Sequence, residues 1–312
     1  MELPSTFDYA GWKIKYSLLE PSQCHTNEIG TIVFVHGTPW SAAIFQPLVE
    51  AIQAKRPSRI LLYDLPGYGQ SQSYTPPPNE SRQQSLFSGD TSVSFQATAL
   101  TALLRKLDLD GIDNRPAPAI IAHDIAGTIV LRSHLIHKCN FRSMLLMDTT
   151  AVLPWGDGFY KLARSQPEVF VQLPRGIFEA VVRAVARSAS HEPRKLEVGW
   201  EDLIVEPWLK ASDGDGLDAQ QRQSNFVRQI AQANDQDVAE MLDQDLYGQV
   251  RCDVKILWGE NDQWIPKEKM EQLSGMIGHS LQGFIVIPKA GHLLMIDQPE
   301  RVGAEVVDWV LR

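Results

Sequence analysis

Short runs of aliphatic residues alternate along the chain with longer amphipathic segments. The runs at 31–35, 60–63 and 119–122 are apolar throughout, without the every-second-residue alternation of a half-exposed strand. Such continuous runs are typical of strands buried on both faces of a parallel sheet. Between them, apolar residues recur at three- and four-residue steps in 44–54 and 94–107, which predicts helices. This order of elements predicts a doubly wound, mostly parallel α/β sheet.

The strand pattern is interrupted in the middle of the chain. A strand at 143–147 is followed by about one hundred residues before the next apolar run, at 254–258. The intervening stretch holds amphipathic segments at 175–189 and 220–233, which predict helices. We therefore expect a helical cap inserted into the sheet domain. The expected division is a first part of the core at 1–150, a cap at 151–247 and a second part of the core at 248–312.

Composition and charge narrow the classes of partner. The 312 residues are 44% hydrophobic and 21% charged, as in ordinary globular proteins. The formal net charge is −9 and no stripe of Lys and Arg occurs, which argues against nucleic acid or an anionic membrane surface as partner. We find no basic, apolar leader and no run long enough to span a bilayer, so we expect a soluble, cytoplasmic protein. The expected partner is a small organic substrate.

The sequence also lacks the patterns of common cofactor sites. Its three cysteines show no C-x-x-C spacing, which argues against a disulfide framework and a zinc site. The glycines at 67 and 69 lack the spacing of a dinucleotide fingerprint, and no phosphate-binding glycine loop is present. We therefore expect neither a cofactor nor a metal.

Asp124 is the leading candidate for a nucleophile. It follows the predicted strand 119–122 and precedes a helix that starts near Thr128, with alanine two residues before it and two after. A strand, a tight turn with small neighbours and a helix are typical of a nucleophile elbow, which projects one side chain at the carboxyl edge of a sheet. The alternative is that Asp124 is an N-cap of the helix, a role that aspartate often fills.

A catalytic acid and a base are expected further along the chain. Asp262 follows the strand 254–258, and His292 follows Gly291 and the last predicted strand, at 282–287. The order nucleophile, acid, histidine is that of a catalytic triad on an α/β-hydrolase sheet. Asp148, at the end of another strand, could orient the histidine instead of Asp262. A single histidine can also be a packed core residue.

Two backbone N–H groups are candidates for an oxyanion hole. Gly37 follows the first predicted strand and lets the backbone turn, so that the Thr38 N–H can point into the cleft. The Ile125 N–H, next to the nucleophile, would supply the second donor. Taken alone, this segment could be an ordinary Gly-Pro loop.

Together these segments resemble the epoxide hydrolase and haloalkane dehalogenase branch of the α/β-hydrolases. The resemblance covers both halves of the core and includes His-Gly-Thr-Pro at 36–39 and the segments 64–71, 122–127, 258–262 and 291–292. It implies the α/β-hydrolase fold and a set of roles. These are Asp124 as nucleophile, His292 as base, Asp262 as its orienting acid, and Thr38 with Ile125 as oxyanion donors.

A carboxylate nucleophile favours displacement at a saturated carbon. Its attack leaves an alkyl ester that histidine-activated water can cleave, whereas serine would leave an inert ether. The leaving group then decides the activity. Epoxide oxygens need O–H donors, which in the resembled family are usually cap tyrosines, and Tyr160 and Tyr247 lie at the two boundaries of the expected cap. We therefore expect an epoxide hydrolase acting on a small to medium apolar substrate, although either tyrosine could be a core residue.

Carbon–halogen hydrolysis by a haloalkane or haloacid dehalogenase is the main alternative. Ile125 and Thr38 stand where many haloalkane dehalogenases have Trp and Asn, which counts against it. Indole N–H groups could still come from Trp40, Trp155 or Trp208, of which the first two are also candidate substrate contacts. Expected cap wall residues are Trp155, Phe159, Phe170 and Phe178. Further alternatives are an esterase, lactonase or C–C hydrolase, a non-hydrolytic enzyme in which Asp124 is a base, and a ligand-binding protein without activity.

Overall fold

The structure is a computed structural model that describes residues 1–312 except 22–29, 79–85, 155, 157, 197–198 and 211–215. Within the described residues the chain forms an eight-stranded sheet with the strand order β1-β2-β4-β3-β5-β6-β7-β8. From β4 to β8 neighbouring strands are parallel, whereas β2 is antiparallel to both β1 and β4. The strands are β1 Ser5–Tyr9, β2 Trp12–Leu19, β3 Ile32–Val35, β4 Ile60–Tyr63, β5 Ala119–His123, β6 Ser143–Met147, β7 Asp253–Gly259 and β8 Leu281–Ile287.

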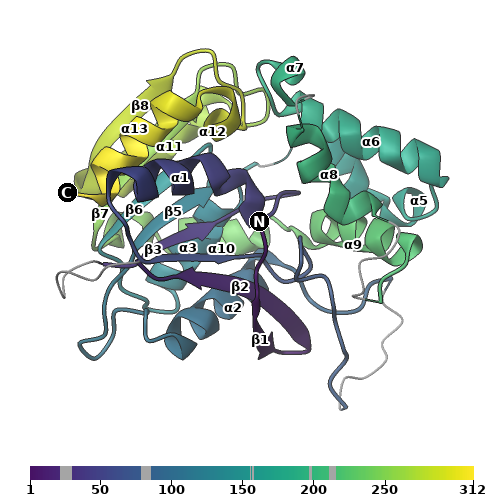
Figure 1. Ribbon diagram of the computed structural model, residues 1–312, viewed down its shortest axis with the longest axis horizontal. Helices are drawn as coiled ribbons and strands as arrows, with labels where there is room; N and C mark the ends of the chain where they lie inside the picture. The colour runs from purple at the N-terminus through teal and green to yellow at the C-terminus, as the bar shows by residue number, and fades with distance from the viewer. Residues whose placement is uncertain (22–29, 79–85, 155, 157, 197–198, 211–215) are drawn as a thin grey trace.

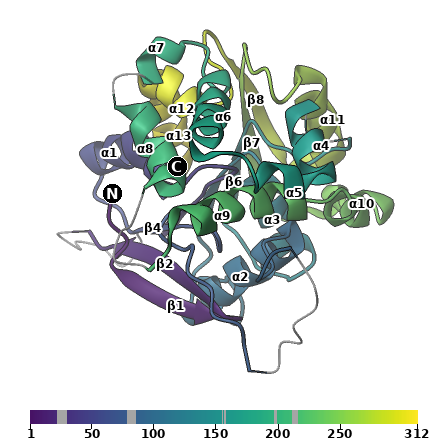
Figure 2. The same cartoon turned by 90° about the vertical axis from the view of Figure 1, so that its right-hand side faces the viewer.

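Helices cover both faces of this sheet (Figures 1 and 2). On one face α1 packs against α13, and on the other α2 packs against α3. The helices of the sheet domain are α1 Gln46–Lys55, α2 Val93–Lys106, α3 Ala126–Leu135, α11 Lys267–Ile277, α12 Leu294–Asp297 and α13 Pro299–Val310, with 3₁₀ turns at η1 Ala42–Phe45, η2 Tyr247–Gln249 and η3 Gly278–Ser280. The predicted doubly wound α/β sheet is thereby confirmed.

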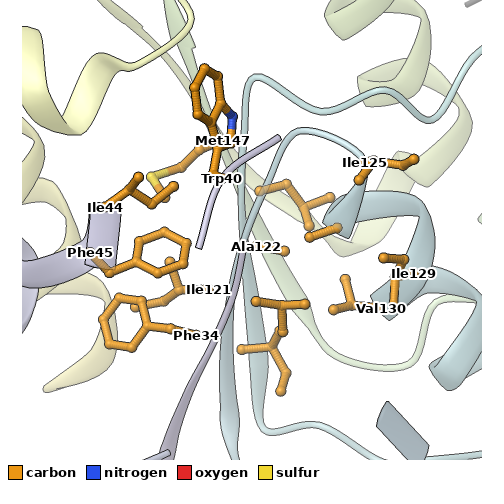
Figure 3. Close-up of a cluster of buried hydrophobic side chains, with 14 of the residues drawn as sticks. Phe34, Trp40, Ile44, Phe45, Ile121, Ala122, Ile125, Ile129, Val130 and Met147 are labelled. Carbon is orange, nitrogen blue, oxygen red and sulfur yellow. The ribbon is translucent and has the colours of Figure 1, made fainter. Parts of the chain in front are cut away.

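The central strands are buried on both of their faces. Figure 3 shows Phe34 and Phe45 on one side of β3 and β5, and Ile129 and Val130 of α3 on the other. These four side chains are all fully buried. Burying one such side chain contributes roughly 1.5–3 kcal/mol to folding, so both faces of these strands favour unbroken apolar runs.

A helical region is inserted between β6 and β7, as the length of the interruption predicts. Its helices are α4 Gly158–Ser165, α5 Pro167–Phe170, α6 Arg175–Ser188, α7 Pro193–Leu196, α8 Trp200–Leu209, α9 Ala219–Gln232 and α10 Gln236–Asp243. Figure 1 shows α5 to α9 grouped beside the sheet domain. The last helix, α10, returns to the core, where Arg132 of α3 binds the Asp237 carbonyl oxygen and the Glu240 carboxylate, both at 2.6 Å.

The N-terminal hairpin β1–β2 was not expected from the sequence. Its residues alternate between half-buried and exposed in β1, so no apolar run marks the strand. The turn uses Ala10 and Gly11, which both have positive φ, at 45° and 86°. Among the described residues, no helix is long and apolar enough to cross a membrane.

Candidate active site

Asp124 occupies a sharp turn between β5 and α3. β5 ends at His123 and α3 begins at Ala126, and Asp124 has a φ of 59°, in the left-handed region that non-glycine residues rarely adopt. The N-cap of α3 is Ile125, and no side-chain hydrogen bond caps this helix. The helix-cap interpretation of Asp124 therefore does not describe this turn.

Gly127 allows α3 to pass close to the end of the neighbouring strand. A Cβ atom at this position would overlap the side chain of Thr149, which lies just after β6. The lack of a side chain at Gly127 thus permits the tight turn, and this turn places Asp124 at the carboxyl edge of the sheet.

Two backbone N–H groups hydrogen-bond the Asp124 carboxylate. Thr38 N donates to Oδ2 at 2.8 Å, and the Ile125 N–H also hydrogen-bonds this carboxylate. Gly37 permits the close approach, because a Cβ there would overlap Asp124 Oδ2. Both donors expected from the sequence, at positions 38 and 125, therefore contact the nucleophile candidate.

His292 lies between Asp124 and Asp262. Its Nε2 is 3.7 Å from Asp124 Oδ1, and its Nδ1 is 2.9 Å from Asp262 Oδ2. Asp262 Oδ1 accepts from the N–H groups of Trp264, at 2.7 Å, and Ile265, at 3.1 Å, which fixes the carboxylate. With Nδ1–H donated to Asp262, Nε2 is left as a proton acceptor facing the nucleophile.

Asp148, the rival acid, is buried at the end of β6 and hydrogen-bonds elsewhere. Its Oδ1 accepts from Gly259 N at 2.8 Å, and its Oδ2 has no hydrogen-bond partner among the described residues. Burial, and then the charge of Asp262, raise the pKa of Asp148 well above its usual value. A carboxyl group with a raised pKa is the weaker partner for an imidazolium, and Asp262 also makes the hydrogen bond to His292, so Asp262 is the better placed of the two acids.

Burial and the neighbouring charges have opposite effects on the pKa of Asp124, and also on that of His292. Burial raises the pKa of Asp124, while the charge of His292 and the N–H groups of Thr38 and Ile125 act to lower it. Burial alone would lower the pKa of His292, but the carboxylates of Asp262 and Asp124 outweigh it and raise that pKa. The two residues therefore stabilise each other's charged forms.

Trp264 packs against the imidazole ring of His292. The two rings are stacked, with centroids 4.6 Å apart and an angle of 27°. Trp264 Nε1 donates to Ser188 Oγ on α6 at 3.1 Å, so the inserted helices are linked to His292 through this indole. Trp40 stacks on Trp264 at 5.6 Å. Sequence reasoning missed Trp264, although its position two residues after Asp262 places it at the same sheet edge.

A cavity of about 60 Å³ lies beside Asp124. Its walls come from the sheet edge and from α4 and α9. The lining residues are Thr38, Asp124, Ile125, Thr150, Gly156, Tyr160, Arg164, Ile230, Ala233, Trp264 and Ile265. Thr150 Oγ1 lies 3.4 Å from Asp124 Oδ1. The narrow space favours a small reacting group.

The two cap tyrosines expected near the substrate have different positions. Tyr160, on α4, lines the cavity and packs edge-on against Trp264, with ring centroids 5.5 Å apart. Tyr247 is 1% exposed, and its hydroxyl donates to the Ala151 carbonyl at 2.6 Å. Tyr247 is not among the lining residues, so the expectation that it contacts substrate is corrected: its hydroxyl serves the packing of the chain at the exit from the insertion.

The tryptophans considered as halide donors are also distributed differently from the expectation. Trp208 Nε1 donates to the Pro39 carbonyl at 2.9 Å. Trp40 is fully buried, its Nε1 has no partner among the described residues, and it does not line the cavity. Trp155 lies outside the described residues. Among the expected wall residues, Phe178 is buried against Phe226 of α9.

One group of side chains in the described part of the chain could hold a metal ion. It comprises His123, Asp148 and His292, whose possible ligand atoms lie within 4.8 Å of one another. His292 Nδ1 is already bonded to Asp262, and His123 Nε2 lies 2.8 Å from the His292 carbonyl oxygen. Because these contacts already occupy two of the three groups, we interpret the cluster as part of the network that positions His292, not as a metal site.

Comparisons with known proteins agree with the observed fold. Residues 32–305 match the profile of a family described as "Alpha/beta hydrolase family". Among curated protein sequences, none matches the chain significantly.

Solved structures of similar fold include several hydrolases. An alpha/beta hydrolase fold protein from Burkholderia ambifaria is 28% identical, with a TM-score of 0.80 over 99% of this chain and 98% of that one. A thermophilic esterase from Thermogutta terrifontis is 19% identical, with a TM-score of 0.69 over 98% and 96%. A haloalkane dehalogenase from Bradyrhizobium elkani is 16% identical, with a TM-score of 0.69 over 98% and 97%. At such identities the last two show the fold alone.

Proposed function

The chain belongs to the alpha/beta hydrolase family, and on this premise we propose that it hydrolyses a bond at a saturated carbon through an ester on Asp124, with a small apolar epoxide as the favoured substrate. The observation that carries the proposal is that the two oxygens of the Asp124 carboxylate have different partners. Oδ2 of Asp124 is held by the Thr38 N–H, while Oδ1 lies 3.7 Å from His292 Nε2 and 3.4 Å from Thr150 Oγ1, beside the cavity.

In the first step Asp124 Oδ1 attacks a ring carbon of the epoxide. A bond forms between Oδ1 and carbon, the carbon–oxygen bond of the ring breaks, and the leaving oxygen takes a proton from the Tyr160 hydroxyl. The product of this step is an alkyl ester on Asp124. Tyr160 is placed for this role because it lines the cavity that Asp124 faces.

In the second step water cleaves the ester. His292 Nε2 takes a proton from water, and the oxygen of that water adds to the carbonyl carbon of Asp124. The negative charge then develops on Oδ2, which the Thr38 N–H already holds, and the Ile125 N–H, which also hydrogen-bonds this carboxylate, is the second candidate donor. Collapse releases Oδ1 with the product, which takes the proton from His292 as it leaves, and the proton lost as the carboxylate re-forms restores Tyr160.

The arrangement supports an epoxide better than a halide. A halide needs N–H donors in the cavity, and the indole that lines it, Trp264, donates to Ser188. Arg164, which lines it too, donates from Nη1 to the Ala233 carbonyl and the Asp235 carboxylate. The other indoles described near the site belong to Trp40 and Trp208, which do not line the cavity. Hydroxyl groups are present instead, on Thr38, Thr150 and Tyr160. Carbon–halogen hydrolysis remains the second candidate, since the same ester chemistry serves both.

A trapped ester tests the proposal. In a His292→Gln variant water is no longer activated, so incubation with styrene oxide should add the full mass of the epoxide to the protein. Bromoethane should add an ethyl group, since bromide is lost, and the mass therefore identifies the chemistry. The matched control is the double variant Asp124→Asn, His292→Gln, which should gain no mass. Absence of any adduct across panels of both substrate classes would contradict the alkylation chemistry.

A further inference from the structure

Tyr68 lies directly behind the oxyanion loop. It belongs to the segment that follows β4, its side chain is 1% exposed, and its hydroxyl oxygen is 2.7 Å from Thr38 Oγ1. Among the described residues, neither hydroxyl has a second hydrogen-bond partner. Thr38 itself lines the cavity. The same residue therefore presents its N–H to Asp124 and its hydroxyl to a buried phenol.

The direction of this hydrogen bond follows from burial. If Thr38 donated, the phenolic proton of Tyr68 would be left without an acceptor in the protein interior, which is costly. If Tyr68 donates, the unused proton is that of Thr38, beside a cavity in which water or substrate can accept it. Burial also raises the pKa of Tyr68, so the phenol keeps its proton. Tyr68 is therefore the donor.

The reaction proposed above uses one O–H donor at the leaving oxygen, Tyr160, and a second hydrogen bond would further stabilise the charge that develops there. Tyr247, the other tyrosine expected from the sequence, bonds to Ala151 away from the cavity. Thr38 lines the cavity from the sheet domain, and Tyr160 lines it from the inserted helix α4. A substrate between them could receive a hydrogen bond from each.

We propose that Tyr68 is a positioning residue: by donating to Thr38 Oγ1 it turns the Thr38 O–H into the cavity, where it donates a second hydrogen bond to the leaving oxygen. This inference rests on the proposed function. No bond to Tyr68 or Thr38 is made or broken, and the proton that reaches the leaving oxygen still comes from Tyr160. The pair acts on ester formation, since the leaving oxygen is already a neutral alcohol when water attacks the ester.

The test separates the two steps in single turnovers of styrene oxide, stopped by acid and followed by intact mass. Tyr68→Phe and Thr38→Val should each slow ester formation roughly five- to tenfold, the worth of one hydrogen bond. Ester hydrolysis should stay within about twofold, because the Thr38 N–H remains in place. Thr38→Ser, which keeps the hydroxyl, should restore ester formation. The double variant should be no slower than Thr38→Val alone, because Tyr68 acts through Thr38.

A matched control is available in Tyr63→Phe. Tyr63 is another buried tyrosine, on β4, whose hydroxyl has no partner among the described residues. Its loss should change neither step. A merely structural role for Tyr68 would slow both steps together or add to the effect of Thr38→Val, and either result would overturn the inference.

Failure of the inference can be told from failure of the proposed function. If no ester forms on Asp124 in the His292→Gln background, the proposed function itself is wrong. If Tyr68→Phe forms the ester as fast as the protein that keeps Tyr68, the proposed function stands and the role proposed for Tyr68 is wrong. Should Tyr68→Phe not fold, Thr38→Val against Thr38→Ser gives the remaining readout. Equal rates of ester formation in those two variants would contradict the donor role of the Thr38 hydroxyl.

Discussion

Asp262 Oδ2 lies 2.9 Å from His292 Nδ1, although a second buried acid, Asp148, ends the adjacent strand. Asp262→Asn should therefore slow ester hydrolysis by about 10³–10⁴, as loss of the orienting acid does in other triads. Asp148→Asn should stay within a few-fold of the unmodified rate, because asparagine can still accept from Gly259 N, the hydrogen bond that Asp148 makes among the described residues. Single-turnover rates of both variants provide the measurement. A larger loss in Asp148→Asn would reverse the assignment.

The two steps should respond differently to pH. Hydrolysis needs neutral His292, whose pKa the carboxylates of Asp262 and Asp124 raise against the effect of burial, so this step should slow as the pH falls through that pKa. Ester formation needs ionised Asp124, whose pKa is raised from 3.8 but starts from a much lower value. In mildly acidic buffer the unmodified enzyme should therefore accumulate ester, which acid quenching and intact mass would detect. Accumulation in alkaline buffer instead would contradict this order.

The two cap tyrosines provide a matched pair. Tyr160→Phe should slow ester formation from styrene oxide by roughly 10²-fold, the usual contribution of a general acid, and should barely affect bromoethane, because bromide leaves without a proton. Tyr247→Phe removes a hydrogen bond to Ala151 and should cost about 1 kcal/mol of stability with the ratio of the two rates unchanged. The rates with both substrates decide between them. Equal slowing of both substrates by Tyr160→Phe would remove its acid role.

Much of the site could be predicted because each triad residue follows a strand. Asp124 directly follows β5, Asp262 and His292 lie in the loops after β7 and β8, and the carboxyl ends of parallel strands meet at one edge. Sequence order therefore implied that they lie close together. The resemblance already favoured Asp262 over Asp148, and the hydrogen bonds of the two acids add a structural reason for that choice.

The residues contributed by loops and by the insertion could not be predicted in the same way. Tyr160 and Tyr247 have similar positions relative to the boundaries of the insertion, but the path of the chain turns one toward the cavity and ties the other to Ala151. Tyr68 contacts Thr38 and Trp264 contacts His292, and both contacts depend on side-chain direction. No periodic pattern marks such contacts.

The elbow also makes a prediction about stability. Gly127→Ala places a methyl group in overlap with Thr149 and should destabilise the fold by about 1–3 kcal/mol, as overpacking does. The control is Gly176→Ala on α6, where an added Cβ meets nothing within 4 Å and should stabilise the helix by roughly 0.5–1 kcal/mol. Urea unfolding of the two variants gives both values. Equal stability of Gly127→Ala and the unmodified protein would mean that the strand and helix are less closely packed than described.

The most direct test of covalent catalysis by Asp124 is a single turnover of an epoxide substrate in water enriched in heavy oxygen. If water attacks an ester on Asp124, the heavy oxygen enters that carboxylate, and the first product molecules carry the unlabelled oxygen that Asp124 supplied. Peptide mass mapping should then find the label at Asp124 and the diol should be unlabelled. Heavy oxygen in the diol with none in the Asp124 peptide would show that water attacks the substrate directly and would contradict the account.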